Sequence, residues 1–470
     1  MANTGITRKL PVEEVLKQKD NSQLKRVLGS FELMMMGVGV IIGTGIFVIT
    51  GTAAADYAGP ALMLSFVFAG VACALAAFCY AELASALPTA GSAFTFTYCG
   101  CGEVWAWVVA WCVILECTVA AAAVATGWGA YAVNLLSIAG LDLPTALTAD
   151  PLSGGIINLP SVILVAAVAL LLKQGTKESA RANNVFVVVK VAAVLLFIIL
   201  GVTHIDTANY NPFLPYGFGG VFSGAAIVFF CYVGFDIIAN SAEEVKNPEK
   251  DPPRGIVGCL LIVTLLYIIV TAVLVGMVPY TEFHGQAAPV AYALATIGIN
   301  WGSALISVAA IIGLIAGVLT CMYSSIRLCF ALARDGLLPK KFSIVNEKSG
   351  VPDIATNLVW LVATIMTGFF PINIIAELVN IGTLLAFVFV CISVIIMRKT
   401  HPDMERAFKC PGSPVLPAIG ALFCAFLITQ LQPLTWMFFG CWIIIGLIIY
   451  FSYGAKHSVA GEYERANKAN

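Results

Sequence analysis

Two charged side chains lie within apolar runs that leave no water to solvate them. Lys190 lies in "NNVFVVVKVAAVLLFIIL", seven residues beyond Asn183, and Glu116 lies in the middle of "WAWVVAWCVILECTVAAAAVATGWG". A buried charge needs a partner or must exchange a proton, so such residues mark proton or ion pathways. Lys190 therefore predicts a proton carrier, with a lysine that snorkels to the membrane surface as the alternative. Glu116 is interpreted as a proton site, a counter-charge for a cationic substrate, or a structural acid.

The stretch "GVGVIIGTGIF" carries four glycines, at positions 37, 39, 43 and 45. Each weakens a helix by up to about 1 kcal/mol relative to alanine. A dinucleotide-binding loop would need a preceding strand and an acid about 20 residues further on, and the sequence has neither. We expect instead that the helix breaks near Gly43, Thr44 and Gly45, which frees amides for an anion and carbonyls for a cation. Such a site suits a zwitterion, whereas close helix packing explains Gly37 and Gly39.

A transporter built on a broken helix should have a second one in the matching position of an inverted repeat, five helices later. The segment "GAAIVFFCYVGFDIIANSAEEVKNP" supplies it, because Gly234 stands beside Asp236 in an apolar run rich in aromatic residues. The remaining acids near this segment or near helix ends are expected to make gating or packing contacts; they are Glu82, Asp236, Glu243, Glu244 and Glu377.

Composition sets the class of protein. The chain has 470 residues, of which 60% are hydrophobic and 11% charged, where a soluble domain carries roughly 25% charged residues. It is therefore expected to be a polytopic membrane protein without a nucleic-acid partner. The 14 cysteines and 4 histidines form no metal-binding pattern, and neither HExxH nor GxSxG occurs. We expect neither an enzyme nor a cofactor.

Runs of about 20 apolar residues predict membrane-spanning helices. Twelve are expected, at residues 31–55, 60–87, 103–136, 156–172, 183–203, 217–243, 254–278, 301–333, 354–370, 374–397, 415–432 and 434–453. The even-numbered connections and the two termini hold 24 of the 25 Lys and Arg residues, and Lys190 is the other. Since Lys and Arg accumulate in cytoplasmic loops, both termini are predicted to be cytoplasmic.

Several motifs together resemble the amino acid–polyamine–organocation superfamily, and most closely its cationic amino acid transporter family of the bacterial type. They are "GVGVIIGTGIF", "YAELASALPTAGSAFTFTY", "FFCYVGFD", "AEEVKNPEKDPPRGI", "ARDGLLPKKF" and "NIGTLLAF". The resemblance implies an all-α membrane protein of the LeuT-type fold, with helices 1 and 6 discontinuous. Its parts would be a cytoplasmic segment (1–30), two inverted five-helix repeats (31–203 and 204–397), two further helices (398–453) and a cytoplasmic tail (454–470).

The resemblance also implies a substrate site at the two breaks. The substrate carboxylate would be held by the amides around Gly43, Thr44 and Gly45. The α-amine would be held by the carbonyls of Ile41, Phe230 and Val233. Phe230 would close over the substrate, and Gly234 would leave room for the backbone.

Coupling and substrate follow from the same resemblance. Lys190 matches a lysine that replaces the sodium ion of sodium-coupled relatives, which implies import of L-amino acids by proton symport across the cell's inner membrane. The expected substrates are small neutral amino acids, and cationic ones stay open because Glu116 offers a partner. Cys321 would narrow the pocket or simply pack between helices. An exchanger, or an amino acid sensor on a transporter scaffold, is the alternative, and the oligomeric state is not predicted.

Overall fold

The computed structural model describes residues 8–9, 11–12, 28–87, 92–174, 180–236, 245–247, 250–346, 349–458 and 461. Within these residues every regular element is a helix, and the nearest approach to a sheet is one isolated bridge between Leu28 and Val245. This confirms the predicted all-α class. Glu243 and Glu244 lie outside the described residues.

The first half of the chain contains two helices that meet at a break and four others that are long. The helices up to the middle of the chain are α2 (Ser30–Ile41), η2 (Gly45–Ile49), α3 (Thr50–Ala53), η3 (Ala54–Ala58), η4 (Gly59–Ala61), α4 (Leu62–Ala86), α5 (Ser92–Gly100), α6 (Glu103–Ile138), α7 (Thr145–Thr148), η5 (Pro151–Ser153), α8 (Leu159–Lys173), α9 (Ala180–Gly201), η6 (Val202–His204) and η7 (Thr207–Tyr210). The short helices η2, α3 and η3 follow one another without a gap, so they form one continuous helical segment.

The second half begins with another short helix that ends at a break. Its helices are α10 (Gly217–Val228), η8 (Phe229–Tyr232), α12 (Asp251–Met277), η10 (Tyr280–Phe283), α13 (Pro289–Thr296), α14 (Asn300–Arg334), η11 (Lys340–Ser343), α15 (Asp353–Phe369), α16 (Ile372–Thr400), α17 (Val415–Thr429), α18 (Pro433–Ile449), η12 (Tyr450–Gly454) and α19 (Ala455–His457).

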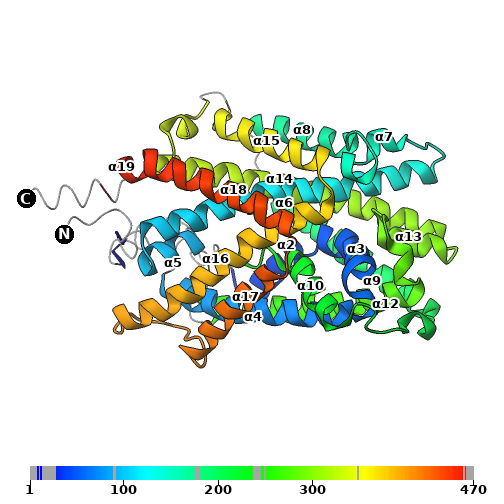
Figure 1. The fold of residues 1–470 in the computed structure, drawn as a ribbon, viewed down its shortest axis with the longest axis horizontal. Coiled ribbons are helices and arrows are strands. Elements are labelled where there is room, and N and C mark those ends of the chain that lie inside the picture. Colours follow the sequence, from blue (N-terminus) through cyan, green and yellow to red (C-terminus); the bar gives the residue numbers. More distant parts are fainter. Residues whose placement is uncertain are drawn as a thin grey trace, which may run out of the picture.

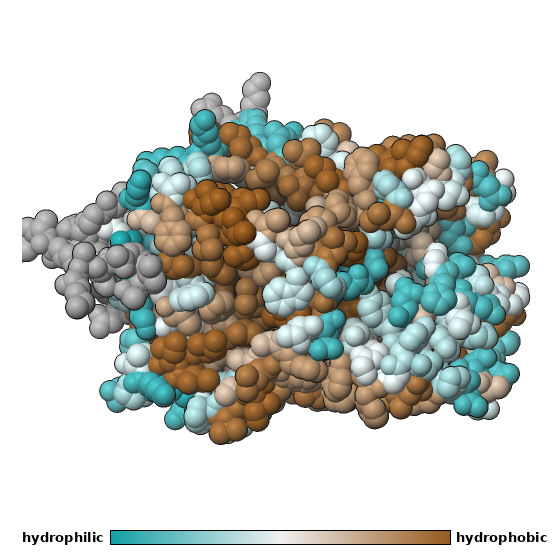
Figure 2. All heavy atoms as spheres, viewed as in Figure 1, coloured by the Kyte–Doolittle hydropathy of each residue, from teal (hydrophilic) through white to brown (hydrophobic). Residues whose placement is uncertain are grey.

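Seven helical stretches among the described residues are long and apolar enough to cross a membrane, and five further apolar helices are shorter. Figure 2 shows hydrophobic side chains spread over the middle of one face, with hydrophilic side chains gathered toward its two ends. These features confirm a multi-pass membrane protein.

Connections that are rich and poor in basic residues lie at opposite ends of the bundle. The end of α16, which carries Arg398 and Lys399, lies at the left in Figure 1 together with α5 and α19. The helices α7 and α13, which belong to connections without Lys or Arg, lie at the right. One end of the bundle thus carries connections with Lys and Arg, and the other end carries connections without them.

Two buried glutamates tie the basic end together. Glu82 accepts hydrogen bonds from Nε and Nη2 of Arg398, at 2.9 and 2.6 Å, and from the backbone amide of Cys410 at 2.7 Å. Glu103 accepts the hydroxyls of Tyr98 and Tyr450 at 2.6 and 2.8 Å and lies 3.1 Å from an Arg8 nitrogen. Burying these carboxylates is tolerable because each is hydrogen-bonded on several sides.

The helix α18 is held against α6 by tryptophans. Trp111 stacks on Trp442 with ring centroids 4.4 Å apart, and the indole N–H of Trp107 donates to the Gly446 carbonyl at 2.9 Å. A Cβ at Gly446 would overlap the Trp111 ring, whereas one at Gly440 on the same helix would meet nothing within 4 Å. The close approach of α18 therefore depends on the missing side chain at Gly446.

We expect Gly446→Val to lower the stability of the protein by about 1–3 kcal/mol, because overpacking forces the α18–α6 contact apart. The matched variant Gly440→Val should change stability little. Thermal unfolding of the detergent-solubilised protein, followed by size-exclusion chromatography, checks both. Equal melting of the two variants would contradict this packing.

Candidate functional site

The first predicted break lies where the sequence placed it. The helix α2 ends at Ile41, and Ile42 is extended with ψ of 103°. The chain becomes helical again at Gly45, in π-helical form. The first N–H groups of a helix and its last C=O groups have no partner within it, so residues 41–45 present both kinds of group in the interior of the protein.

The second break follows η8 and lies against the first. Val233 is extended with ψ of 131°, and Gly234 has φ of 115°, which a residue with a side chain rarely adopts. A Cβ at Gly234 would lie 2.6 Å from Val40 Cγ1, and a Cβ at Gly45 would lie 2.7 Å from Cys231 Cα. The two broken segments therefore touch through their glycines.

Carbonyls freed by the breaks are satisfied by side chains of other helices. The Tyr267 hydroxyl of α12 lies 2.9 Å from the carbonyl oxygens of both Ile41 and Cys231, so one residue joins the two breaks. Asn380 of α16 donates to the Ala226 carbonyl at 2.7 Å. Tyr131 of α6 also donates, at 2.6 Å, to the Phe47 carbonyl, which lies within the helical segment that follows the first break. Sequence reasoning missed these three residues, although each is a polar side chain within an apolar helix.

Lys190 reaches the first break from α9. Its ammonium donates to the Gly39 carbonyl at 2.6 Å, and the residue is only 6% exposed. Two glycines make room for this contact: a Cβ at Gly39 would overlap Val187 of α9, and a Cβ at Gly313 of α14 would overlap the Lys190 stem. The side chain therefore points into the bundle and not toward the membrane surface, which removes the snorkelling alternative.

Two features at the first break indicate space and bonding capacity for a small molecule. The Thr44 hydroxyl is buried and has no hydrogen-bond partner in the described part of the chain. A Cβ at Gly43 would meet no atom within 4 Å, although both neighbouring residues are buried. A buried hydroxyl without a partner costs free energy, so a polar ligand beside Gly43 would complete this region.

The other predicted site residues surround the breaks. Phe230 is buried within η8, and its carbonyl accepts the Val233 amide at 3.3 Å. Cys321 lies on α14, is half-buried, and is close enough to interact electrostatically with Lys190. Ile41, Phe230 and Val233 thus keep carbonyl oxygens near one another, but two of these oxygens already accept a hydrogen bond from the protein.

Glu116 belongs to a second polar group. It is 6% exposed on α6 and lies beside Thr383 of α16 and within electrostatic range of Asp236, which follows the second break. Two carboxyl groups in one buried place repel each other when both are ionised. Glu116 therefore lies within electrostatic range of another acid, and its role as a proton site, a counter-charge or a structural acid stays a prediction.

At the opposite end of the bundle from Glu82, the part of the first helix that follows the break is fastened on several sides. We call the residues Asp56, Tyr57, His284, Glu377 and Gln432 the outer clamp. Asp56 lies 2.6 Å from His284, and the Tyr57 hydroxyl donates to Glu377 at 3.2 Å. Gln432 donates to the Tyr57 oxygen at 2.6 Å and, through its backbone amide, to Glu377 at 3.0 Å. These contacts join η3 to η10, α16 and the segment before α18.

Comparison with known proteins places the chain among transporters. A family model described as "Amino acid permease" matches residues 28–459. The branched-chain amino acid permease BcaP of Bacillus subtilis is 45% identical over 97% of this chain and 98% of its own. The methylthioribose transporter of the same organism is 44% identical over 97% and 99%. Cationic amino acid transporter 2 of Arabidopsis thaliana is 39% identical over 85% of this chain and 64% of its own. These relatives are transporters, which confirms that the chain is not an enzyme.

We expect Tyr267→Phe to destabilise the protein by about 1–3 kcal/mol, because it leaves two buried carbonyls without their donor. Tyr210→Phe is the matched control: Tyr210 also donates to a carbonyl, that of Ala272 at 2.8 Å, but this carbonyl lies within the intact helix α12. Its loss should cost less. Thermal unfolding in detergent checks the order, and a larger loss for Tyr210→Phe would contradict the role given to Tyr267.

Proposed function

Because the chain belongs to the amino acid permease family, we propose that it imports L-amino acids as a secondary active transporter driven by proton symport. The observation that carries this proposal is the contact between the two breaks, with the Lys190 ammonium bonded to the Gly39 carbonyl beside them. The unpartnered Thr44 hydroxyl supports a polar substrate at the same place.

The proposed architecture is the LeuT-type fold with twelve membrane-spanning helices, of which ten form two inverted five-helix repeats and two follow them. The breaks after Ile41 and after Tyr232 fall in the first and sixth of these helices, as that fold requires. In the proposed orientation the protein lies in the cell's inner membrane, and the basic end of the bundle, with Arg398 and Lys399, faces the cytoplasm. The outer clamp then faces outward.

In the proposed substrate pose, the carboxylate lies at the amides of Gly43, Thr44 and Gly45, at the positive end of the outer half-helix. The α-amine lies near the Ile41, Phe230 and Val233 carbonyls, at the negative C-terminal ends of α2 and η8. Carbonyl oxygens have two lone pairs, so those that already accept a protein hydrogen bond can still accept the amine. Phe230 covers the substrate from the outer side.

The coupling follows from the position of Lys190. As an ammonium it donates to the Gly39 carbonyl and stabilises the end of α2. As a neutral amine it binds this carbonyl less strongly, because a charged donor makes the stronger hydrogen bond. Loss of the proton therefore loosens the inner half of the first helix, and rebinding of the proton restores it. No metal or cofactor takes part in this scheme.

The substrate class is proposed from the chemistry of the site. The breaks recognise the backbone of an amino acid, and the neighbouring side chains of Phe230 and Cys321 favour small or branched neutral side chains. A cationic side chain would need Glu116 to be ionised and within reach. The methylthioribose transporter is similar to this chain over nearly the full length of both proteins. Methylthioribose should therefore be tested as a competitor of amino acid uptake.

We expect proton-driven accumulation to disappear in Lys190→Met. An inward gradient of one pH unit is worth about 1.4 kcal/mol, which supports about tenfold accumulation at one proton per substrate. Proteoliposomes containing the wild-type protein should reach this level with labelled leucine or alanine, and the variant should only equilibrate. Labelled arginine in parallel ranks the cationic class.

The control for this experiment is Lys341→Met, which removes an exposed lysine far from the breaks in the sequence. It should accumulate substrate like the wild type. Accumulation by Lys190→Met would overturn proton coupling through this residue. Uptake that ignores the gradient but requires amino acid inside the vesicles would establish exchange in place of symport.

Alternating access predicts that the outer clamp holds the outward path closed. Tyr57→Phe removes two hydrogen bonds worth about 0.5–1.5 kcal/mol each, so the outward-open population should rise about tenfold. A Thr44→Cys reporter should then react about tenfold faster with a membrane-impermeant thiol reagent added outside. Tyr292→Phe, which removes only an exposed contact with Glu282, is the control. An unchanged labelling rate in Tyr57→Phe would contradict the clamp.

A further inference from the structure

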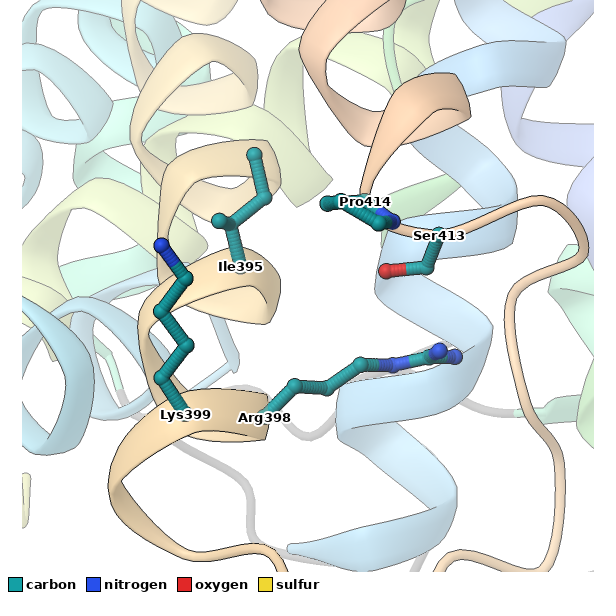
Figure 3. A pocket seen from close by; sticks show the side chains of 5 residues that line it. All are labelled: Ile395, Arg398, Lys399, Ser413 and Pro414. Atoms are coloured by element: carbon teal, nitrogen blue, oxygen red, sulfur yellow. The ribbon is translucent and has the colours of Figure 1, made fainter.

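A small cavity lies at the basic end of α16, away from the broken helices. Its volume is about 140 Å³, and it is lined by Ile395, Arg398 and Lys399 of α16 and by Ser413 and Pro414, which immediately precede α17. Figure 3 shows Lys399 extending along α16 beside Ile395, while the Ser413 hydroxyl points from the opposite wall toward α16. The cavity is therefore bordered by polar groups on two walls.

These polar groups have unused hydrogen-bonding capacity. The Ser413 oxygen is buried and has no hydrogen-bond partner among the described residues. Arg398 donates hydrogen bonds from Nε and Nη2 to the Glu82 carboxylate and from Nη2 to the Cys410 carbonyl. Its other terminal nitrogen, Nη1, donates to no described residue. Lys399 is exposed and forms no ion pair in the described structure. Three side chains that carry hydrogen-bond donors thus line one space (Figure 3), and no acceptor from the described residues fills it.

The local charge favours an anion. Glu82 is shared by two guanidinium groups, because Arg406 also lies 3.3 Å from it. Lys399 and Lys409 add positive charge, and the acids of the connection, Asp403 and Glu405, are exposed. The 15-residue helix α17 begins two residues after Ser413, and the partial positive charge of its N-terminus adds to the positive charge around the cavity. A group with several oxygen acceptors and a negative charge, such as a phosphate, matches this set of donors.

The surroundings of the cavity are apolar. Val415, Ile419 and Leu422 of α17 are 62%, 51% and 71% exposed, and Ile395 forms part of the cavity wall. A free phosphate ion gains nothing from such a surface, whereas acyl chains do. We propose that the cavity binds the phosphate of an anionic phospholipid of the cytoplasmic leaflet, whose acyl chains lie against α17.

The leaflet assignment rests on the membrane orientation proposed above. The binding itself depends on neither substrate nor proton coupling. The bound headgroup would join the end of α16 to the start of α17, next to the Glu82 ion pairs. It would thereby fix the connection between these two helices at the membrane surface.

Native mass spectrometry of the whole detergent-solubilised protein, titrated with phosphatidylglycerol or phosphatidylcholine, tests the proposal. The wild type should retain phosphatidylglycerol more tightly. Lys399→Gln should weaken this binding about fivefold, the effect of one basic residue near an anionic lipid surface. Ser413→Ala should weaken it about three- to tenfold through the lost hydrogen bond. Lys399→Arg should retain it.

Lys341→Gln is the matched control, because it removes an exposed lysine from another connection at the basic end. If it weakens phosphatidylglycerol binding as much as Lys399→Gln while Ser413→Ala has no effect, binding reflects diffuse surface charge and the proposal fails. It also fails if the two lipids bind equally, or if inorganic phosphate displaces phosphatidylglycerol, which would identify a soluble anion as the ligand.

Melting of each variant in neutral lipid shows whether it is folded. If Lys399→Gln melts early, Ser413→Ala carries the comparison, and if Ser413→Ala melts early, Lys399→Gln carries it. Since lipid retention is measured without transport, a failure of the proposed symport leaves this test intact, and the converse also holds.

Discussion

A backbone carbonyl inside a bilayer must find a hydrogen-bond donor, and this structure breaks two helices where water is excluded. Each unsatisfied group there costs several kcal/mol. Three side chains from three different helices meet this demand: Lys190 from α9, Tyr267 from α12 and Asn380 from α16. The arrangement of these helices around the breaks follows from the reach of their donors.

The protein supplies donors for several freed carbonyls but leaves other groups at the first break open. Thr44 has a buried hydroxyl without a partner in the described structure, and the space beside Gly43 is open. A ligand that carries both a carboxylate and an amine has the matching charges for the two kinds of helix end. The same break thus explains why neighbouring helices need polar residues and why we propose a zwitterion as the substrate.

The breaks could be predicted from the sequence, because glycines in an apolar run have a direct local cost. The depth of Lys190 could be predicted for a similar reason, since a lone charge stands out among apolar residues. Its acceptor could not, because Gly39 lies 151 residues away. Tyr267 illustrates the same limit: its hydroxyl contacts residues 226 and 36 positions away, and in the sequence it is only one aromatic residue within an apolar helix. The bonding of Glu82 and Glu377 likewise depends on distant segments, although their general role in contacts near helix ends was expected.

The proposed link between proton and substrate needs no long pathway in this structure. Lys190 bonds to the Gly39 carbonyl, Tyr267 contacts the Ile41 carbonyl, and the proposed carboxylate site begins at Gly43. All three lie on one short stretch of backbone, where a change in one hydrogen bond alters the conformation available to the next. Coupling between two ligands requires that each bind differently to the same pair of states. Residues 39–45 end one half-helix and begin the other, so both the proton and the substrate can bias the conformation of this segment. Tyr267 connects the segment to the second break through the Cys231 carbonyl.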